Sequence, residues 1–480
     1  MNRKQALKFG RFLIRWGIAV IGIWWVISKM SWHDHVWALL PGQAMPTKDL
    51  TLTDFAADES SGVYHVILSG QPVTLLHDEV INQPDRDNLR EFDKGSGKVE
   101  CVVAVDLSPD LKQARRLLVA DKADGPVARW EPASDFPNYQ ITVPHPRVQI
   151  GVLRMLREAD IRYFLAALAI FPVTILITSL RWHELLKAVD IRLNLGRTFV
   201  LNMVGLFYNT IMPLGSTGGD LLKAYYVRKQ THHGTRAVMS VAVDRVIGLL
   251  ALIVLGGTMA ALQRHIPRCR QVAIASAAIL AFTAAAMIVF YVPKLRRWSG
   301  LEFILERLPL QKQVRKAIET MHIYAGRPFL VLGALIVSFP VHMVVITAAQ
   351  LCGIAFGLHL SGFYYWTAVP VIVLASALPI SPQGAGVMEY FAVKLLEPQG
   401  VTVGQAFALT MSIRLTQIFW NLTGGIFVLR GGYHKPSQTE QKQAEEEDEQ
   451  EDEDEKSEIR MTNQARMTKS ELIRHSVIRI

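Results

Sequence analysis

Cysteine is scarce in this chain: Cys101, Cys269 and Cys352 are the three among 480 residues. Their wide separation does not match the spacing of metal ligands. Cys101 is alone between residues 31 and 150, so no disulfide can form within that segment. The phosphate-loop pattern G-x-x-x-x-G-K-[ST] is also missing. The sequence therefore predicts no metal site and no cofactor, and we find no catalytic constellation.

Charged residues are missing from three long stretches. No Asp, Glu, Lys or Arg occurs from Tyr163 to Leu180, from Gln271 to Pro293, or from Pro328 to Met388. A helix needs about 20 apolar residues to cross the hydrocarbon core of a bilayer. Half of the chain is hydrophobic and its mean hydropathy is +0.22, which is too apolar for an ordinary soluble protein of this size. These stretches predict a polytopic membrane protein.

The apolar runs predict the individual spans. Trp16 to Ser28 follows a basic start and is not followed by an A-x-A-like cleavage site, so we expect an uncleaved signal-anchor. The positive-inside rule then puts the N-terminus in the cytoplasm. Further spans are expected at Ile161 to Leu180, Ala237 to Leu262, Gln271 to Val292, Pro328 to about Ala349, and Val403 to Leu429. The last of these ends at Arg430, so the C-terminus is also expected in the cytoplasm.

Residues 31–150 form a polar insertion after the first span. They contain 18 acidic and 11 basic residues, and the orientation of the first span predicts that they lie outside the membrane. The stretch "VYHVILSGQPVTLL" is typical of a β-hairpin and "KVECVVAVDL" of a strand. "SPDLKQARRLLVADK" favours a helix with Ser108 as its N-cap. We therefore expect a small extracytoplasmic α+β module.

The tail after the last span is strongly charged. Residues 440–458 hold 12 acids and two lysines, and a block of like charge is expected to be disordered. The rest of the chain is basic enough to bring the net charge to +9. We interpret these basic residues as cytoplasmic loops that face anionic lipid, not as a nucleic-acid surface.

Two breaks rich in glycine and proline interrupt the apolar pattern. The first is "NTIMPLGSTGGDLLKAYY" (Asn209 to Tyr226) and the second is "ALPISPQGAGVMEYF" (Ala377 to Phe391). Residues on both sides of the first break are basic, which favours a re-entrant hairpin that starts and ends in the cytoplasm. The second break would be approached from outside. Aligning them places Pro213 over Pro379, Gly218 over Gly384, Gly219 over Ala385, and Lys223 over Glu389.

Such paired breaks in inverted halves point to the central site of a transporter. Short helices that start after Gly219 and Gly386 would direct free N–H groups to the middle of the membrane, where they attract anions. Arginines in the following spans, Arg245 and Arg414, are suited to bind a phosphate in a bidentate manner. Acids near them are expected to balance the arginines, receive a headgroup amine or carry a coupling proton: Asp220, Asp244 and Glu389.

Four stretches carry a resemblance to a known family: "SLRWHELLKA", "FYNTIMPLGSTGGDLLKAYYVRK", "SVAVDRVIGLL" and "ALPISPQGAGVMEY". Over about Arg147 to Gly432, and in the first span, the chain resembles the lysylphosphatidylglycerol synthase transmembrane (flippase-like) family. The resemblance implies a bacterial or archaeal polytopic membrane protein, and some members are proposed to flip lipids. The positions that it carries over are Arg181, Pro213, Gly218, Gly219, Asp220, Arg245, Pro379, Gly384, Glu389 and Arg414.

Three positions depart from the family pattern, which often has Arg at Lys223, Glu at Asp244 and Gly at Gln383. A lysine binds phosphate in a less bidentate way, which weakens the phosphate role implied for Lys223. The soluble aminoacyl-transferase domain of full-length synthases is not found after Arg430, so lysyl transfer is not expected. The long external insertion also differs from the short loop that is typical of the family.

The predicted fold is mainly α: a polytopic α-helical membrane bundle with two inverted re-entrant hairpins and a small extracytoplasmic α+β insertion. Its parts are a signal-anchor span (1–30), the insertion (31–150), the flippase-like core (151–432) and a disordered tail (433–480). The predicted substrate-binding residues are Pro213, Gly218, Gly219, Asp220, Lys223, Asp244, Arg245, Pro379, Gly384, Glu389 and Arg414, with Arg181, Asn209 and Tyr225 supporting them.

Two classes of function remain open. The first is a translocase in the cytoplasmic membrane that moves a lipid, expected to be anionic, or a lipid-linked headgroup by alternating access around the two hairpins. The second is a membrane-embedded enzyme or assembly factor for an envelope lipid or glycan, with the insertion as its active module. Membrane lipids are the expected partners in both cases, nucleic acid is not, and a homo-oligomer is compatible with the sequence.

Overall fold

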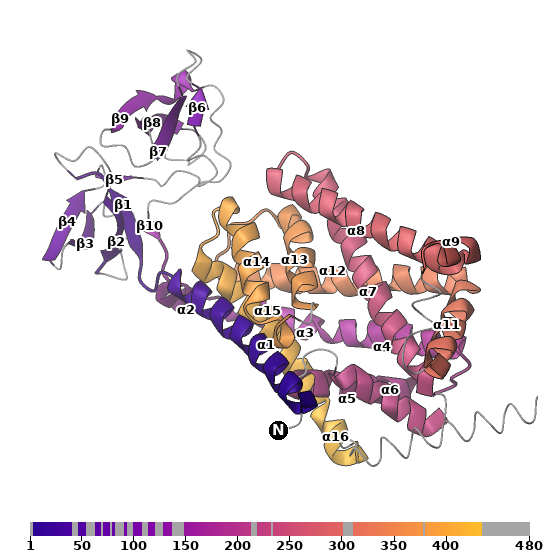
Figure 1. The fold of residues 1–480 in the computed structure, drawn as a ribbon. Coiled ribbons are helices and arrows are strands. Elements are labelled where there is room, and N and C mark those ends of the chain that lie inside the picture. Colours follow the sequence, from indigo (N-terminus) through magenta and orange to yellow (C-terminus); the bar gives the residue numbers. More distant parts are fainter. Residues whose placement is uncertain are drawn as a thin grey trace, which may run out of the picture. The chain divides into compact units, whose positions relative to one another are not determined.

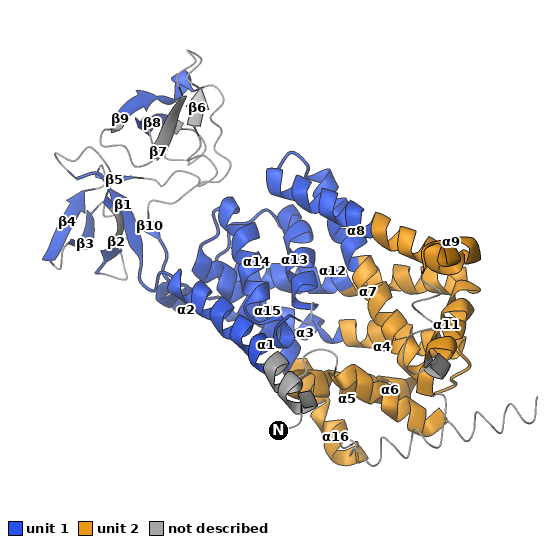
Figure 2. Ribbon diagram, in the orientation of Figure 1, with its two compact units in different colours: residues 1–173, 252–280, 342–418 blue, residues 174–251, 281–341, 419–480 orange. Residues whose placement is uncertain are grey.

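The computed structural model describes residues 3–40, 47–53, 63–68, 71–76, 79–81, 91–93, 99–107, 114–120, 128–136, 148–212, 218–231, 234–300, 311–377 and 380–433 (Figure 1). The chain divides into two compact units, each assembled from three stretches (Figure 2). The first unit comprises residues 1–173, 252–280 and 342–418, and the second comprises 174–251, 281–341 and 419–480. The predicted tail, 433–480, lies almost entirely outside the described residues.

Within the described residues, four helical stretches are long and apolar enough to cross a membrane. They are Ile161–Ala188, which joins α3 (Ile161–Ile170) to α4 (Pro172–Ala188), then α7 (Gly234–Leu262), α8 (Pro267–Tyr291) and α12 (Pro328–Ala355). Each corresponds to a predicted span. The first helix, α1 (Arg3–Ser28), contains a shorter apolar stretch, Leu13–Ser28. The last predicted span becomes α15 (Val403–Thr423) and α16 (Gly425–Gly431), and these are not among the four.

Both glycine-rich breaks separate two helices that pack side by side. The first break joins α5 (Leu195–Ile211) to α6 (Gly218–Thr231), and the second joins α13 (Gly362–Ala377) to α14 (Val387–Leu396) through a 3₁₀ turn at Pro382–Gly384. At 1.5 Å per residue, the ten residues of α14 extend about 15 Å, roughly half of the hydrocarbon thickness. Helical hairpins are therefore present at both predicted places.

The helix boundaries reveal an internal repeat. The interval from the start of α6 to the start of α14 (218 to 387) equals the interval from α7 to α15 (234 to 403). The intervals from α3 to α12 (161 to 328) and from α5 to α13 (195 to 362) are equal to each other, and they are nearly as long as the first two intervals. The first repeat is therefore α3–α7 and the second is α12–α16. Between them, the described residues contain α8, α9 (Pro293–Trp298) and α11 (Gln311–Ala325).

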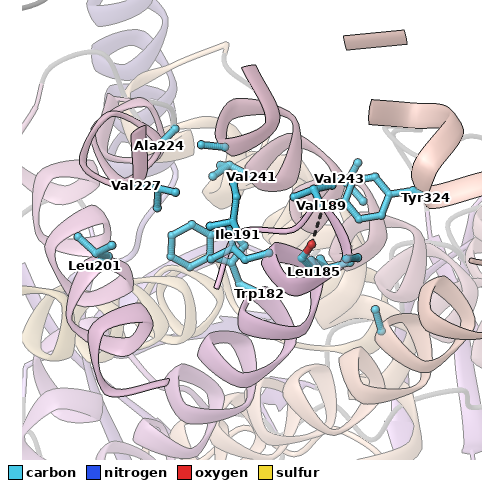
Figure 3. Packing of buried hydrophobic residues seen from close by; sticks show 14 of the residues in the cluster. Trp182, Leu185, Val189, Ile191, Leu201, Ala224, Val227, Val241, Val243 and Tyr324 are labelled. Atoms are coloured by element: carbon cyan, nitrogen blue, oxygen red, sulfur yellow. Dashed lines mark hydrogen bonds between the residues drawn. The ribbon is translucent and has the colours of Figure 1, made fainter. Parts of the chain in front are cut away.

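A cluster of apolar side chains forms the core of the second unit (Figure 3). The indole of Trp182 on α4 is completely buried there, with Leu201 from α5 and Val227 from α6 in the same cluster. Tyr324 on α11 joins the cluster and donates a hydrogen bond of 2.9 Å to the carbonyl of Leu185. Because the first hairpin buries its apolar face in this core, the position of α6 relative to α4 is fixed.

The described part of the insertion consists of strands, with a short 3₁₀ turn at Ala133–Asp135. One sheet has the order β10-β1-β2-β3-β4, with β5 also paired to β1. Its strands are β1 (His35–Ala38), β2 (Thr47–Leu52), β3 (Val63–Leu68), β4 (Gln71–Leu76), β5 (Val80–Ile81) and β10 (Val148–Gln149). The predicted hairpin is confirmed, since β3 and β4 pair antiparallel with Val66 opposite Val73.

The second sheet contains a strand where the sequence predicted a helix. Its order is β6-β7-β8-β9, with β6 (Glu91–Asp93), β7 (Val99–Leu107), β8 (Ala114–Ala120) and β9 (Ala128–Pro132). The strand predicted around Cys101 is confirmed as β7. The helix predicted from Ser108 is wrong over 114–120, because β8 forms ladders with a strand on each side and buries Leu117 to Ala120. Strand pairing and burial outweigh the local helical preference there.

Helix α1 packs against the second hairpin within the first unit. A Cβ atom on Gly22 would lie 2.6 Å from the Cα atom of Gly386, so the two backbones are in van der Waals contact. Next to this point, the ring centroids of Trp25 and Tyr390 are 5.2 Å apart.

The two ends of the insertion meet beyond the C-terminal end of α1. Buried Asp34 accepts hydrogen bonds from the Gly151 N–H (2.7 Å) and from Nη1 of Arg154 (3.1 Å). Asp34 lies at the start of the insertion, and Gly151 follows its last residue. These contacts of Asp34, together with the pairing of β1 and β10, close the insertion at its base.

We predict that Gly22→Ala destabilises the protein while Gly17→Ala does not. Both substitutions gain the same helix propensity, but a Cβ atom at Gly22 meets Gly386, whereas nothing lies within 4 Å of one at Gly17. Overpacking of this kind costs about 1–3 kcal/mol. Thermal unfolding of the purified variants in detergent measures the difference. Equal melting temperatures for the two variants would contradict the contact between α1 and the second hairpin.

Candidate functional site

The second hairpin contains a buried ion pair. Glu389, the third residue of α14, is completely buried, and its Oε1 atom lies 2.7 Å from Nη2 of Arg414 on α15. Its Oε2 atom accepts a hydrogen bond of 2.7 Å from the N–H of Gly386, the residue that precedes the helix. Glu389 therefore neutralises the arginine and caps its own helix. Glu389 is thus the acid that balances Arg414, as expected for one of the acids near the arginines.

The backbone of the break also contacts this arginine. Nη1 of Arg414 donates a hydrogen bond of 2.9 Å to the carbonyl of Gln383. Gln383 has φ +49°, in the left-handed region that favours glycine, and this is a position where the family often has glycine. Among the described residues, Nε of Arg414 and Oγ of Ser381 are buried without a hydrogen-bond partner. The break is thus held to the arginine, which keeps one N–H donor that no described residue uses.

The first hairpin contains a related cluster. Asp220, the third residue of α6, forms an ion pair with Nε of Arg245 on α7. Its Oδ1 atom lies 3.6 Å from Nζ of Lys223 and accepts a hydrogen bond of 3.4 Å from Nδ2 of Asn209. The side-chain oxygen of Asn209 accepts the N–H of Gly219 at 2.8 Å. Asn209 therefore supports both the helix start and the carboxylate.

A third ion pair, which is buried, lies next to this cluster in the second unit. Nε of Arg181 on α4 lies 2.8 Å from Oδ1 of Asp244 on α7, and Nη1 of Arg181 donates a hydrogen bond of 2.6 Å to Ser338 on α12. Both charged side chains are more than nine-tenths buried. Asp244 and Arg245 are neighbours in sequence but have different partners. Asp244 therefore balances Arg181, and Asp220 is the acid that meets Arg245.

The two hairpins match in a register that differs from the one predicted. The interval from Asp220 to Glu389 equals the interval from Arg245 to Arg414, and each acid is the third residue of its helix. The same interval pairs Pro213 with Pro382. The shared pattern is I-x-P-x-G-x-x-x-x-[DE], with an arginine at the same distance after the acid in both repeats. The alignment of Lys223 with Glu389 is therefore wrong, because Pro379 was chosen in place of Pro382.

Close backbone contacts explain the glycines of both hairpins. A Cβ atom on Gly219 would overlap the carbonyl oxygen of Gly205, so α5 and α6 touch at this point. A Cβ atom on Gly384 would lie 2.4 Å from the Cα atom of Ser376 on α13. Gly218, by contrast, is simply the buried first residue of α6. Pro213 and Pro379, which were also predicted, lie outside the described residues.

Several contributors were not predicted from the sequence. Trp182, Ser338 and Gln383 contact the charged residues, and no motif distinguished the first two from ordinary apolar or small helix residues. Tyr225, which was predicted to support the site, packs edge-on against Tyr226 at a centroid distance of 5.3 Å and belongs to the rim of the apolar core. Within the described residues, no group of three or more His, Cys, Asp or Glu side chains could hold a metal ion.

The geometry suits the exchange of one anion for another. Each guanidinium is held by a carboxylate at a helix N-terminus, where backbone N–H groups also favour negative charge. The Gly219 and Gly386 N–H groups already have side-chain acceptors, so an incoming anion would have to displace a protein oxygen. A phosphate is a suitable competitor, because it matches the guanidinium fork in charge and shape.

We predict that Glu389→Gln and Arg414→Gln each destabilise the protein by about 3–5 kcal/mol, since each leaves a buried charge without its partner. The double variant should recover part of this loss because both charges are gone. Chemical or thermal unfolding of the three variants measures the coupling. As a control, Glu184→Gln removes the partner of Lys187 in a pair whose side chains are half exposed, and should change stability by less than about 1 kcal/mol. Additive losses in the double variant would contradict direct coupling.

Comparison with known proteins identifies a family for the helical part of the chain. The family model for the lysylphosphatidylglycerol synthase TM region matches residues 151–425. A UPF0104 membrane protein of Pyrococcus horikoshii is 24% identical over 306 residues, which cover 58% of this chain and 90% of that protein. A UPF0104 membrane protein of Methanothermobacter thermautotrophicus is 22% identical over 286 residues, which cover 56% of this chain and 84% of that protein. The family match covers more than half of the chain, and the chain therefore belongs to the family of the lysylphosphatidylglycerol synthase TM region.

Proposed function

We propose that this multi-pass membrane protein translocates a lipid or lipid-linked headgroup across the membrane. The observation that supports this most strongly is an acid–arginine pair at matching positions of two repeats, after a break in each. Glu389 of the second pair is completely buried, whereas the side chains of Asp220 and Arg245 in the first pair are 13% and 34% exposed. A charge at the bilayer centre costs roughly 2.5–3.5 kcal/mol even on the lenient insertion scale. Two repeat-matched pairs at that cost favour a use in transport over a purely structural role.

The inferred topology gives the two hairpins opposite orientations. If α3–α4 leads into the cytoplasm, the first hairpin returns there, α7 leads out, α8 leads back, and α12 leads out again. The second repeat is then inverted relative to the first, the arrangement that is typical of alternating-access transporters. In this topology both termini are cytoplasmic and the insertion is extracytoplasmic. We place the protein in the cell or inner membrane as part of this proposal.

The proposed cycle uses the arginines as sites of exchange. The phosphate of a headgroup competes with Asp220 or Glu389 for the guanidinium of Arg245 or Arg414, while the acyl chains stay in lipid. The displaced carboxylate then takes a headgroup amine or a proton, so that no charge stays unpaired. The hairpins open on opposite sides, so each serves one side of the membrane. No covalent step is needed.

We predict that the charge-free double variants Asp220→Asn/Arg245→Gln and Glu389→Gln/Arg414→Gln both lose flipping, by at least about tenfold, while they remain folded. The assay follows fluorescent phospholipids with different headgroups in proteoliposomes, with thermal unfolding measured on the same preparations. Glu184→Gln is the control and should flip at the wild-type rate. The proposal fails if a folded double variant flips as fast as wild type, because the pairs would then be structural.

A further inference from the structure

The two hairpins differ in one buried charge. In the second hairpin, Glu389 faces one cation, Arg414. In the first hairpin, the carboxylate of Asp220 lies within 4 Å of two cations, Arg245 and Lys223. The repeat places Ala392 at the position that corresponds to Lys223. Lys223 is therefore an addition to the shared plan and gives the first cluster one more positive group than the second.

The surroundings of Lys223 bind its ammonium group weakly. The residue is 5% exposed, and its distance of 3.6 Å to Asp220 is too long for a strong hydrogen bond. The Nζ atom also lies 4.5 Å from the ring centroid of Trp182, a cation–π contact. The indole is itself held in place by a hydrogen bond of 3.2 Å from Nε1 to Ser240. Two weak contacts do not replace the hydration that a buried ammonium loses.

The stem of Lys223 fixes where the charge can lie. A Cβ atom on Gly205 would lie 3.2 Å from Cδ of Lys223, so the aliphatic part of the lysine packs tightly against α5. The ammonium group is therefore confined to the end of the cluster bounded by Asp220 and Trp182. The ammonium group of Lys223 is thus fixed in position but only weakly paired. It is suited to bind a ligand that carries a negative charge.

We propose that the first hairpin binds the phosphate group of an anionic phospholipid, with Lys223 as the residue that determines this preference. This rests on the proposed function and adds a difference between the two hairpins. A phosphodiester with one negative charge offsets the additional cation, and its oxygens offer acceptors for both Lys223 and Arg245. A zwitterionic headgroup brings an extra positive charge into a site that already has two cations, and binds more weakly for that reason.

The test measures binding without transport. Purified full-length protein in a non-ionic detergent is titrated with dihexanoyl phosphatidylglycerol, dihexanoyl phosphatidylcholine or inorganic phosphate, and the melting temperature is followed. We expect phosphatidylglycerol to raise the melting temperature of the wild-type protein at least about ten times more effectively, by concentration, than phosphatidylcholine. Inorganic phosphate at the same concentration shows whether the bare anion is recognised without the lipid. If inorganic phosphate raises the melting temperature as much as phosphatidylglycerol does, the assignment to a lipid is overturned.

The variants isolate the lysine. Lys223→Met keeps the packed stem and removes the charge, and should abolish the preference for phosphatidylglycerol while leaving the ligand-free melting temperature equal to or above wild type. Lys223→Arg keeps a cation at this position and should keep the preference for phosphatidylglycerol. Lys187→Met removes an exposed positive charge and should leave the preference intact. The inference is overturned if Lys223→Met binds phosphatidylglycerol as wild type does, or if its ligand-free form melts well below wild type. Because this experiment measures binding directly, its result can be interpreted even if the protein does not flip lipids.

Discussion

The pairing of a carboxylate that is largely shielded from solvent with an arginine on the next helix is the constraint on which both hairpins depend. A guanidinium in a low-dielectric region is costly unless an anion is held close to it. In both hairpins, one helix ends at a glycine-rich break, and the helix that follows the break has an acidic third residue. The break, the glycine contacts that let the helices approach, and the caps on α6 and α14 all serve to place that acid.

Each compact unit contains parts of both repeats. The second unit contains the middle of the first repeat, residues 174–251, and the first unit contains the corresponding middle of the second repeat, residues 342–418. The ends of each repeat belong to the other unit: 161–173 and 252–262 to the first, and 328–341 and 419–431 to the second. Each unit thus combines one hairpin with helix ends from the other repeat. Helix α1 and the insertion are additions to the first unit, outside the region that matches the family.

The sequence was a good guide where the physical signal is local. Spans follow from charge-free runs, because a bilayer selects directly for length and apolarity, and the β3–β4 hairpin follows from alternation around a short turn. The helix expected over 114–120 was wrong because its surroundings, two neighbouring strands, are not encoded locally. The partner of Asp244 could not be chosen from sequence, since Arg181 is far away along the chain and Arg245 is adjacent. The contact between Lys223 and Trp182 depends on helix packing in the same way.

Opposite orientation of the two repeats is the central claim of this account, and it can be measured at two matched loops. Arg192 lies three residues before α5, and Ser361 lies immediately before α13 in the corresponding loop of the second repeat; both are exposed. Single cysteines at these positions, in a background with Cys101, Cys269 and Cys352 replaced by alanine, are treated with a membrane-impermeant maleimide in intact cells and in inside-out vesicles. We predict that the Arg192→Cys variant labels only from the cytoplasmic side and the Ser361→Cys variant only from outside. Labelling of both from the same side would contradict the inverted repeat and, with it, the proposed transport cycle.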